Sequence, residues 1–250
     1  MARPTAAMLV IGDEVLSGRT RDANTGHLAG VLTAMGIALR EARVCPDETP
    51  EIVRHVNDLR QAYDYVFTSG GIGPTHDDIT ADSVAQAFGV SIGVREDARA
   101  ILAAYYADPA DLNEARLRMA RIPDGASLIL NPVSHAPGFR LGNVFVMAGV
   151  PAIFQAMVES VRPTLTGGAP VLAWSFRAAV AEGDLAGPLR ALASAMPEVS
   201  FGSYPFFRGG LGATLVARSA DRAALARAAD ALRAMLADLG AGKVSETPPA

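Results

Sequence analysis

Several features that would assign this chain to a common class of protein are absent. Cys45 is the only cysteine among 250 residues, which excludes an intrachain disulfide and a zinc site built from several cysteines. We expect it to be a small buried strand residue rather than a nucleophile. The net charge of −4 at pH 7 argues against general nucleic-acid binding, which usually requires a basic face. We therefore expect no nucleic-acid partner, and an anionic ligand must be held by backbone geometry, a few arginines or a metal.

The chain also lacks a long apolar run. The first apolar stretch, residues 6–11, is short and runs directly into two acids, which is not typical of a signal peptide. The most apolar segment, residues 144–158, is interrupted by Gly149 and Pro151 and is too short to span a bilayer. Half of the residues are hydrophobic, so a sizeable core is possible. These observations predict a cytoplasmic protein with no membrane partner.

The first ninety residues alternate between strand and helix patterns. Strands are expected at residues 6–11, 37–45 and 65–68, and the second is more polar, as expected near a sheet edge. Each is followed by a helical pattern; the first helix is capped by Asp22 or Asn24 and ends at Gly36. This alternation predicts an α/β fold with a mainly parallel sheet.

The rest of the chain divides at a Gly- and Pro-containing linker, residues 166–170. Before it we expect a short strand at 90–94, helices at 95–106 and 112–121, a turn at 122–125, a strand at 128–130, a hairpin over 139–147 and a helix at 152–165. Beyond it the pattern is strand, helix, strand, strand, helix, which predicts a small α+β module of the ferredoxin or KH type. The predicted domains are therefore residues 1–166 and 171–240, with a disordered tail at 241–250.

The stretch from Ser69 to Thr80, S-G-G-I-G-P-T-H-D-D-I-T, is the strongest candidate for a ligand site. It lies between a buried strand and a helix, so backbone N–H groups and the positive end of a helix dipole meet there, which favours phosphate. It lacks the Gly-Lys-Ser/Thr of a P-loop and the spacing of a Rossmann turn. Asp77 and Asp78 are either acids of the helix start or ligands of a divalent cation.

Other polar residues follow the carboxyl ends of the remaining parallel strands, where open α/β sheets bind ligands. They are the Gly12-Asp13-Glu14 turn and Asp47, each of which has an alternative interpretation as a surface turn or a helix-start acid. The four histidines show no metal-ligand spacing. The aromatic residues of the second domain are expected in its core rather than on a stacking platform, and they are Trp174, Phe176, Tyr204, Phe206 and Phe207.

Taken together, these stretches resemble the molybdopterin-binding (MoaB/Mog) fold and specifically the CinA-like competence/damage-inducible family. The resemblance rests on I-G-D-E-V-L-S-G with Asp22-Ala23-Asn24, on the Ser69 to Thr80 stretch, on N-P-V-S-H-A-P-G-F from Asn131, and on M-A-G-V-P from Met147. It implies a three-layer α/β/α Rossmann-like domain, a nucleotide or pterin pyrophosphate as the small-molecule partner, and a homodimer or homotrimer. S-Y-P-F-F at 203–207 resembles the family's KH-like module.

The resemblance also implies site residues. Two essential aspartates of the fold's adenylyltransferases fall on Asp47 and Asp78, and a divalent metal such as Mg²⁺ is expected at Asp77 and Asp78. The expected ligand-binding residues are Gly12, Asp13, Glu14, Ser17, Gly18, Asp22, Asn24, Ser69, Gly70, Gly71, Gly73, Pro74, Thr75, Thr80, Asn131, Pro137 and Gly138.

Three functions follow as alternatives. CinA-like members are associated with metal-dependent ADP-ribose pyrophosphatase activity, which is the first hypothesis. Where the family commonly has P-G-V-P-x-E, this chain has Ala148 before Gly149 and Ile153 in place of the glutamate, which motivates a non-catalytic binding module as the second. Molybdopterin adenylylation is the third. The 250 residues contain no counterpart of the amidase domain often found in CinA proteins, so deamidation of nicotinamide nucleotides is not expected.

Overall fold

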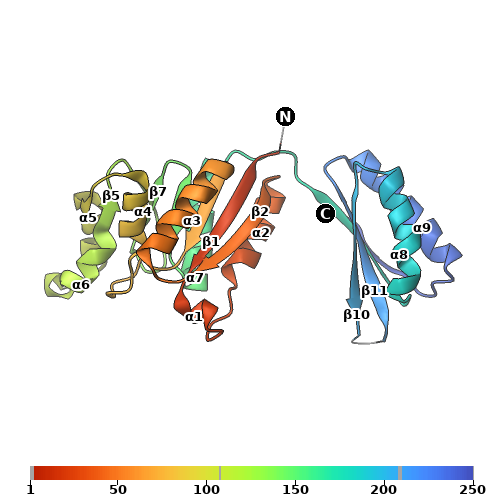
Figure 1. Cartoon of the computed structure of the whole chain (residues 1–250), viewed down its shortest axis with the longest axis horizontal. Helices are drawn as coiled ribbons and strands as arrows, with labels where there is room; N and C mark the ends of the chain where they lie inside the picture. The colour runs from red at the N-terminus through yellow and green to blue at the C-terminus, as the bar shows by residue number, and fades with distance from the viewer. Residues whose placement is uncertain (1–2, 107, 208–209, 250) are drawn as a thin grey trace. The chain divides into compact units, whose positions relative to one another are not determined.

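The chain forms two compact units, Met1–Gly168 and Ala169–Ala250, in a computed structural model that describes residues 3–106, 108–207 and 210–249. Figure 1 shows a mixed α/β unit followed by a smaller unit in which two helices lie on one side of a sheet. In the described part of the chain, no helix is long and apolar enough to cross a membrane.

The first unit is built on a six-stranded sheet with the order β2-β1-β3-β8-β7-β6. Its strands are β1 (Thr5–Ile11), β2 (Ala38–Cys45), β3 (Tyr65–Ser69), β6 (Ser127–Ile129), β7 (Gly138–Leu141) and β8 (Val144–Met147). The four strands from β2 to β8 pair in parallel, whereas β7 and β6 are added in antiparallel pairs. The mainly parallel sheet is therefore confirmed, and the more polar β2 lies at its edge as its sequence predicted.

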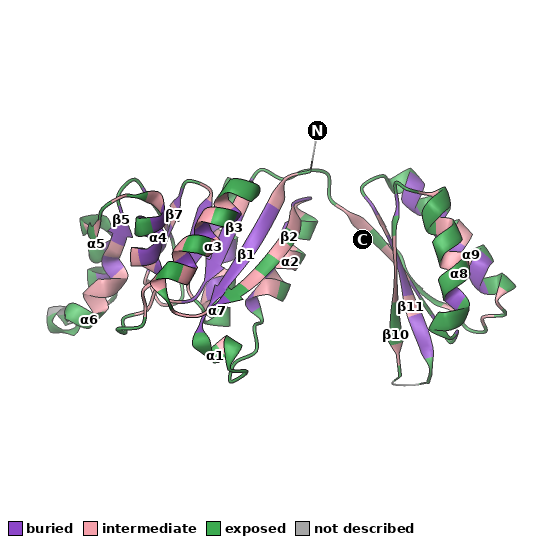
Figure 2. Cartoon of the chain, viewed as in Figure 1, coloured by how far each residue is buried: buried purple, intermediate pink, exposed green. Residues whose placement is uncertain are grey.

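Helices cover both faces of this sheet. Because successive strand residues point to opposite faces, Leu9 packs in one core with α3 and α4, while Met8 packs in another with α2 and α7. Figure 2 shows β1 and β3 as buried strands. The helices of the first unit are α1 (Asp13–Leu16), α2 (Asn24–Ala34), α3 (Thr49–Ala62), α4 (Thr80–Phe88), α5 (Glu96–Tyr105), α6 (Glu114–Leu117) and α7 (Pro151–Val161), with 3-10 turns at Pro109–Asp111, Arg118–Ala120 and Arg162–Thr164. The three-layer α/β/α fold is confirmed.

One region of the first unit differs from the prediction. The helix expected over 112–121 is replaced by the short α6 and a 3-10 turn. A strand, β5 (Arg121–Pro123), takes the first two positions of the turn expected at 122–125. This strand pairs antiparallel with β4 (Ile92–Val94), so cross-strand bonding replaces the last helical turn. Ile122, an isolated apolar residue of β5, is buried, and it pairs with Gly93 of β4. The local sequence pattern could not predict this pairing, because the partner strand lies about thirty residues earlier in the chain.

The second unit contains β9 (Leu172–Ala178), α8 (Glu182–Ala195), β10 (Ser200–Phe206), β11 (Gly212–Ser219), α9 (Arg222–Asp238) and β12 (Ser245–Thr247). Its sheet has the order β10-β11-β9-β12 with antiparallel pairs throughout. A β-α-β-β-α-β chain with this strand order is the ferredoxin-like arrangement rather than the KH one.

The tail prediction was wrong for the part of residues 241–250 that forms β12. This strand pairs with β9, and the Glu246 carboxylate accepts hydrogen bonds from Arg233 of α9 at 2.8 and 2.9 Å. Strand pairing and this two-point ion pair hold a segment whose composition alone suggested disorder. Ala250 lies outside the described residues.

The aromatic prediction was correct for two of the five residues. Trp174 and Phe176 face the helices and pack in the core of the second unit. Tyr204 and Phe206 lie on the opposite face of the sheet, and Phe207 is 75% exposed. Successive side chains of β10 point to opposite faces of the sheet, which the sequence alone predicts. Which of the two faces the helices cover is shown only by the pairing of the strands.

Candidate functional site

A cleft of about 550 Å³ opens at the carboxyl ends of β1, β3 and β8. This edge of a parallel sheet is where ligands bind in open α/β folds. The cleft is lined by Ile11, Gly12, Glu14, Thr20, Asp47, Gly70, Gly71, Ile72, Gly73, Pro74, Asp77, Asp78, Met119, Asn131, Ser134, Ala136, Ala148, Gly149, Val150, Pro151 and Ile153. Loops distant in sequence therefore share one hollow.

The Gly70-Gly71 turn forms the floor of the cleft. Both residues have positive φ values, 113° and 68°, which favour glycine. A Cβ atom on Gly70 would collide with the carbonyl oxygen of Ile11, and one on Gly71 would collide with the Thr80 hydroxyl. Thr80 is fully buried, and its N–H donates to the Gly71 carbonyl at 3.0 Å. The glycines thus allow the end of β3 to lie against the end of β1, and the hydrogen bond from Thr80 holds the turn in place.

Asp78 is held by the loop that precedes α4. One carboxylate oxygen, Oδ2, accepts from the Thr75 N–H at 2.8 Å and from the Thr75 hydroxyl. A Cβ atom on Gly73 would lie 2.6 Å from the same oxygen, so glycine is needed for its close approach. Thr75 is exposed and orients Asp78 rather than lining the cleft. Asp77 is exposed on the cleft wall.

Asp47 lines the same cleft as Asp78 and lies in the loop between β2 and α3. Its Oδ2 accepts from the Asp13 N–H at 3.0 Å. Partial burial raises the pKa of Asp47, and the negative charges of Asp13, Glu14 and Asp77 raise it further, against the lowering effect of that hydrogen bond. A carboxylate with a raised pKa takes up a proton more readily than an ordinary surface acid, which suits acid–base chemistry.

Asn24 connects the loops beneath the cleft. Its Nδ2 donates to the Ser69 hydroxyl at 2.7 Å and to the Gly149 carbonyl at 2.8 Å. The side chain is buried, and it borders a small hollow next to the cleft that Asp22 and Ser69 also line. Of the two predicted helix caps, Asp22 performs this role, because its Oδ1 accepts from the N–H groups of Asn24 and Thr25 at 2.9 and 3.2 Å.

Asn131 shapes its own loop. Its Oδ1 accepts from Val133 and Ser134 N–H groups at 3.0 and 3.1 Å, and its Nδ2 donates to the Ser134 hydroxyl and the Ala136 carbonyl. Because these four hydrogen bonds use both donors and the acceptor of the amide, Asn131 fixes the wall that Ser134 and Ala136 present to the cleft.

Several expected ligand residues lie outside the cleft lining that the structure describes. Gly138 is buried where a Cβ atom would collide with Val146 and Met157, so packing explains it. Pro137 borders a separate small cavity, and Ser17 and Gly18 are exposed after α1. Asp13 contributes its backbone N–H to Asp47. Residues that the sequence did not indicate, above all Thr20 and Met119, belong to no motif and reach the cleft only through tertiary folding.

The charged side chains that line the cleft in the described structure are all acidic, namely Glu14, Asp47, Asp77 and Asp78. No three His, Cys, Asp or Glu side chains of the described residues converge as a ready metal site. Cys45 lies below the cleft, where burial raises the pKa of its thiol to about 12, so it is not a nucleophile. The described lining therefore offers backbone groups and carboxylates but no basic side chain. Arg118, which donates to the Asp78 carbonyl at 3.3 Å, lines a small cavity beside it.

Comparisons with known proteins match this architecture. Residues 7–167 match the family model described as a probable molybdopterin binding domain, and residues 170–243 match the middle domain of FAD synthase. A protein of Pyrobaculum arsenaticum is 35% identical over 82% of this chain and 81% of its own length. A CinA-like protein of Desulfosudis oleivorans is 35% identical over 68% of this chain, which spans 43% of that protein. The crystal structure of CinA of unknown function from Thermoplasma acidophilum, 34% identical, superposes with a TM-score of 0.61 over 65% of this chain and 98% of that one.

Proposed function

The chain belongs to the family of probable molybdopterin-binding domains, with CinA-like relatives, and from this premise we propose that it is a divalent-metal-dependent pyrophosphatase acting on dinucleotides of the ADP-ribose type. The observation that carries the proposal is the composition of the cleft. A glycine-rich turn and four carboxylates line one hollow of about 550 Å³, a size that suits a nucleotide.

The absence of a cation from the described lining explains why a metal is part of the proposal. A pyrophosphate brought alone to Glu14, Asp47, Asp77 and Asp78 would be repelled by their charges. Mg²⁺ usually takes only one or two protein carboxylates and completes its shell with water and substrate phosphates. Asp77 and the Oδ1 atom of Asp78 can supply these one or two carboxylate ligands, because Thr75 donates only to Oδ2 of Asp78. When bound, the metal would polarise the phosphoryl group.

The remaining roles belong to the chain's own residues. The N–H groups of Gly71 and Gly73 bind the pyrophosphate oxygens, whereas those of Gly70 and Gly12 donate to the carbonyls of Met147 and Cys45 and hold the loops. Asp47, held by the Asp13 N–H, orients the attacking water and accepts its proton, for which its raised pKa is suited. Thr75 fixes Asp78, and Asn24 fixes the spacing of the loops after β3 and β8.

The test is incubation of the protein with ADP-ribose and Mg²⁺ or Co²⁺, followed by chromatography for AMP. FAD is the second substrate to include, since the second unit matches a FAD synthase domain and FAD also contains an ADP moiety joined through a pyrophosphate. We expect AMP from at least one of them and none when EDTA is present. Metal-independent release, or no release with any metal, would contradict the proposal.

A second candidate function is binding without turnover. It is motivated by Ile153, which lines the cleft as an apolar side chain where the family motif commonly carries a glutamate. Calorimetric binding of ADP-ribose or a molybdopterin without AMP formation would favour this alternative. Adenylylation of molybdopterin, the third function, would require ATP and would appear as an adenylylated pterin when ATP and molybdopterin are supplied together.

A further inference from the structure

The sheet of the second unit leaves one face without helices. Phe176 of β9 and Leu215 of β11 are paired neighbours whose side chains enter the core with α9 residues such as Leu225. Figure 1 shows α8 and α9 on that same side. The residues that alternate with them point to the other face, where Tyr204, Thr214 and Arg177 form one row across three strands.

Each of the two aromatic rings of this open face contacts a glycine of the sheet. A Cβ atom on Gly202 would come within 3.2 Å of the Tyr204 ring, so the ring lies over Gly202. A Cβ atom on Gly212 would similarly collide with the Phe206 ring. Any larger residue at either glycine would lift the ring off the sheet. Each ring therefore lies against the sheet through its contact with a glycine.

An arginine lies near each of the two rings, and the two contacts differ. The Arg177 guanidinium stacks over the Phe206 ring, with its central carbon 3.3 Å from the ring centroid. Arg218 is farther from the Tyr204 ring, with its central carbon 5.6 Å from the ring centroid, and its Nη2 donates to the tyrosine hydroxyl at 3.0 Å. Tyr204 is 49% exposed. The open face thus presents one half-exposed aromatic ring with a guanidinium 5.6 Å from its centre.

The charged strand residues that point to this face among the described positions are all basic. The strand residues that point to it among the described positions are Ser200, Gly202, Tyr204, Phe206, Gly212, Thr214, Val216, Arg218, Ala173, Ser175, Arg177, Ser245 and Thr247, and they contain no acid. Glu246 of β12 points the other way, to Arg233. The face is therefore complementary to an anion, in contrast to the acidic cleft of the first unit.

We propose that this open face binds a nucleotide, with the base stacked on Tyr204 and the phosphate paired with Arg218. Aromatic rings lying flat on a four-stranded sheet are suitable stacking surfaces for bases, and guanidinium groups recognise phosphate. A single nucleotide fits better than a strand, because Arg177 lies close over Phe206, whereas the half-exposed Tyr204 ring has its guanidinium 5.6 Å from its centre. The site is separate from the cleft and does not depend on its activity.

The test uses the full chain and 8-azido-AMP as a photoaffinity probe, with AMP as competitor and peptide mapping by mass spectrometry. We expect the label on β10 or β11, and we expect it to persist in the Asp78→Asn variant, whose change lies in the cleft. Calorimetry with AMP should show affinity falling about tenfold in Tyr204→Ala, from lost stacking, and about tenfold in Arg218→Gln, from a lost charged hydrogen bond. Tyr204→Phe, which keeps the ring, should retain the stacking.

Arg190→Gln is the matched control, since it removes the same charge from the exposed surface of α8. Circular dichroism establishes that each variant is folded. The proposal is overturned if the label maps only to residues 70–78, or if Arg190→Gln weakens binding as much as Arg218→Gln. Oligoadenylate binding that strengthens steeply with length would assign the face to single-stranded nucleic acid instead. A change of oligomeric state in Tyr204→Ala with unchanged AMP affinity would assign it to a contact between copies.

Discussion

At the scale of single residues, the two aspartates of the proposed mechanism are held in different ways. Asp78 is oriented through one oxygen by Thr75, which leaves the other oxygen for a ligand. Asp47 is partly buried among negative charges, with one N–H donor from Asp13. The hydrogen bond from Thr75 fixes the position of Asp78, whereas burial and the neighbouring charges raise the proton affinity of Asp47.

Replacing Asp78 by asparagine removes one charge while leaving an oxygen that accepts from Thr75. We expect release of AMP from ADP-ribose to fall by about 100-fold or more, because a positioned carboxylate of the reaction is lost. The thermal unfolding temperature should change little. Asp124→Asn, in the exposed turn after β5, is the control and should retain full turnover. Equal turnover in both variants would exclude Asp78 from the mechanism.

Replacing Asp47 by asparagine should change stability and turnover in opposite directions. A carboxyl whose pKa is raised by folding makes the folded state less stable once pH exceeds its unfolded value of 3.8, so the neutral amide removes that cost at pH 7. Turnover should nevertheless fall, because asparagine cannot accept a proton. Urea unfolding and AMP release, measured on the same sample, test this pair of effects. A destabilised Asp47→Asn protein would contradict the burial argument.

Asn24→Ala tests the residue that joins the loops. It leaves the Ser69 hydroxyl and the Gly149 carbonyl without their partner, and we expect a loss of about 1–3 kcal/mol in the free energy of unfolding. Asn57→Ala is the control, because its amide accepts only from Arg60 near the surface. Chemical denaturation measures both. Similar losses in the two variants would show that Asn24 is not a buried connector.

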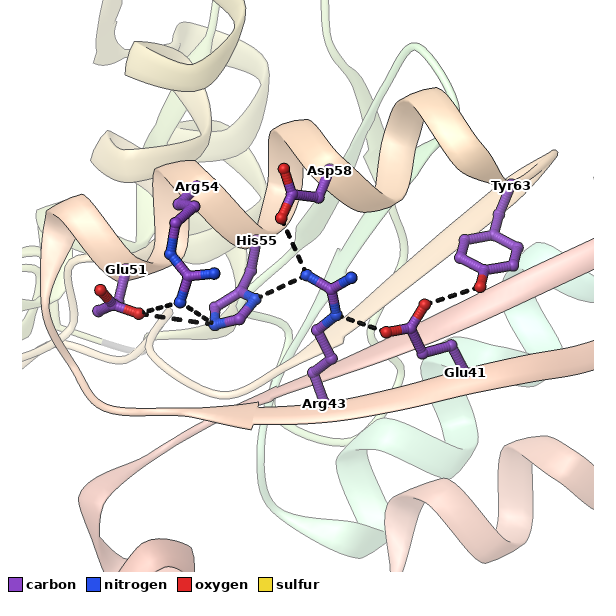
Figure 3. A network of polar contacts seen from close by, with 7 residues as sticks. All are labelled: Glu41, Arg43, Glu51, Arg54, His55, Asp58 and Tyr63. Atoms are coloured by element: carbon purple, nitrogen blue, oxygen red, sulfur yellow. Dashed lines mark hydrogen bonds and ion pairs between the residues drawn. The ribbon is translucent and has the colours of Figure 1, made fainter.

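At the scale of elements, a polar network attaches α3 to the edge strand β2. Figure 3 shows the guanidinium of Arg43 between Glu41 of its own strand and Asp58 and His55 of α3. Arg54 contacts the other ring nitrogen of His55 at 3.0 Å. A neutral imidazole accepts one hydrogen bond, whereas a protonated ring would turn N–H groups toward both guanidiniums.

This network predicts a stability that depends on pH. Burial lowers the pKa of His55, and the charges of Arg54 and Arg43 lower it further. The unfolded chain therefore binds a proton at a higher pH than the folded one, so the free energy of unfolding falls as pH decreases below the unfolded value of 6.5.

Urea unfolding between pH 8 and pH 5 measures this effect, and the His55→Gln variant should show a smaller slope because it has no titrating ring. His76→Gln is the control, since His76 is fully exposed and its removal should leave the slope unchanged. Identical slopes in wild type and His55→Gln would contradict the assignment.

At the scale of the whole molecule, the two units carry separate surfaces. All residues that line the cleft belong to Met1–Gly168. The last residues of that unit are tied to it, because the Gly168 N–H donates to the Met35 carbonyl at 3.0 Å. The boundary for dissection is therefore after Gly168. Homo-oligomerisation stays a prediction.

We expect residues 1–168 expressed alone to release AMP from ADP-ribose, and residues 169–250 alone to release none. The reason is that the first unit contains every proposed catalytic residue and its own hydrophobic cores on both faces of its sheet. The same chromatographic assay on both fragments tests this, with circular dichroism to establish folding. Hydrolysis that requires both fragments together would show that the second unit completes the active site.

The sequence by itself determined the alternating strands and helices, the parallel sheet and the glycine-rich turn, because these depend on local periodicity and on φ values that only glycine adopts readily. Only the tertiary structure decided that Thr75 holds Asp78, that Asn24 lies under the loops while Asp22 caps the helix, and that β12 is ordered. It also decided that Tyr204 faces outward. Each of these depends on a partner or a sheet face that local sequence does not specify.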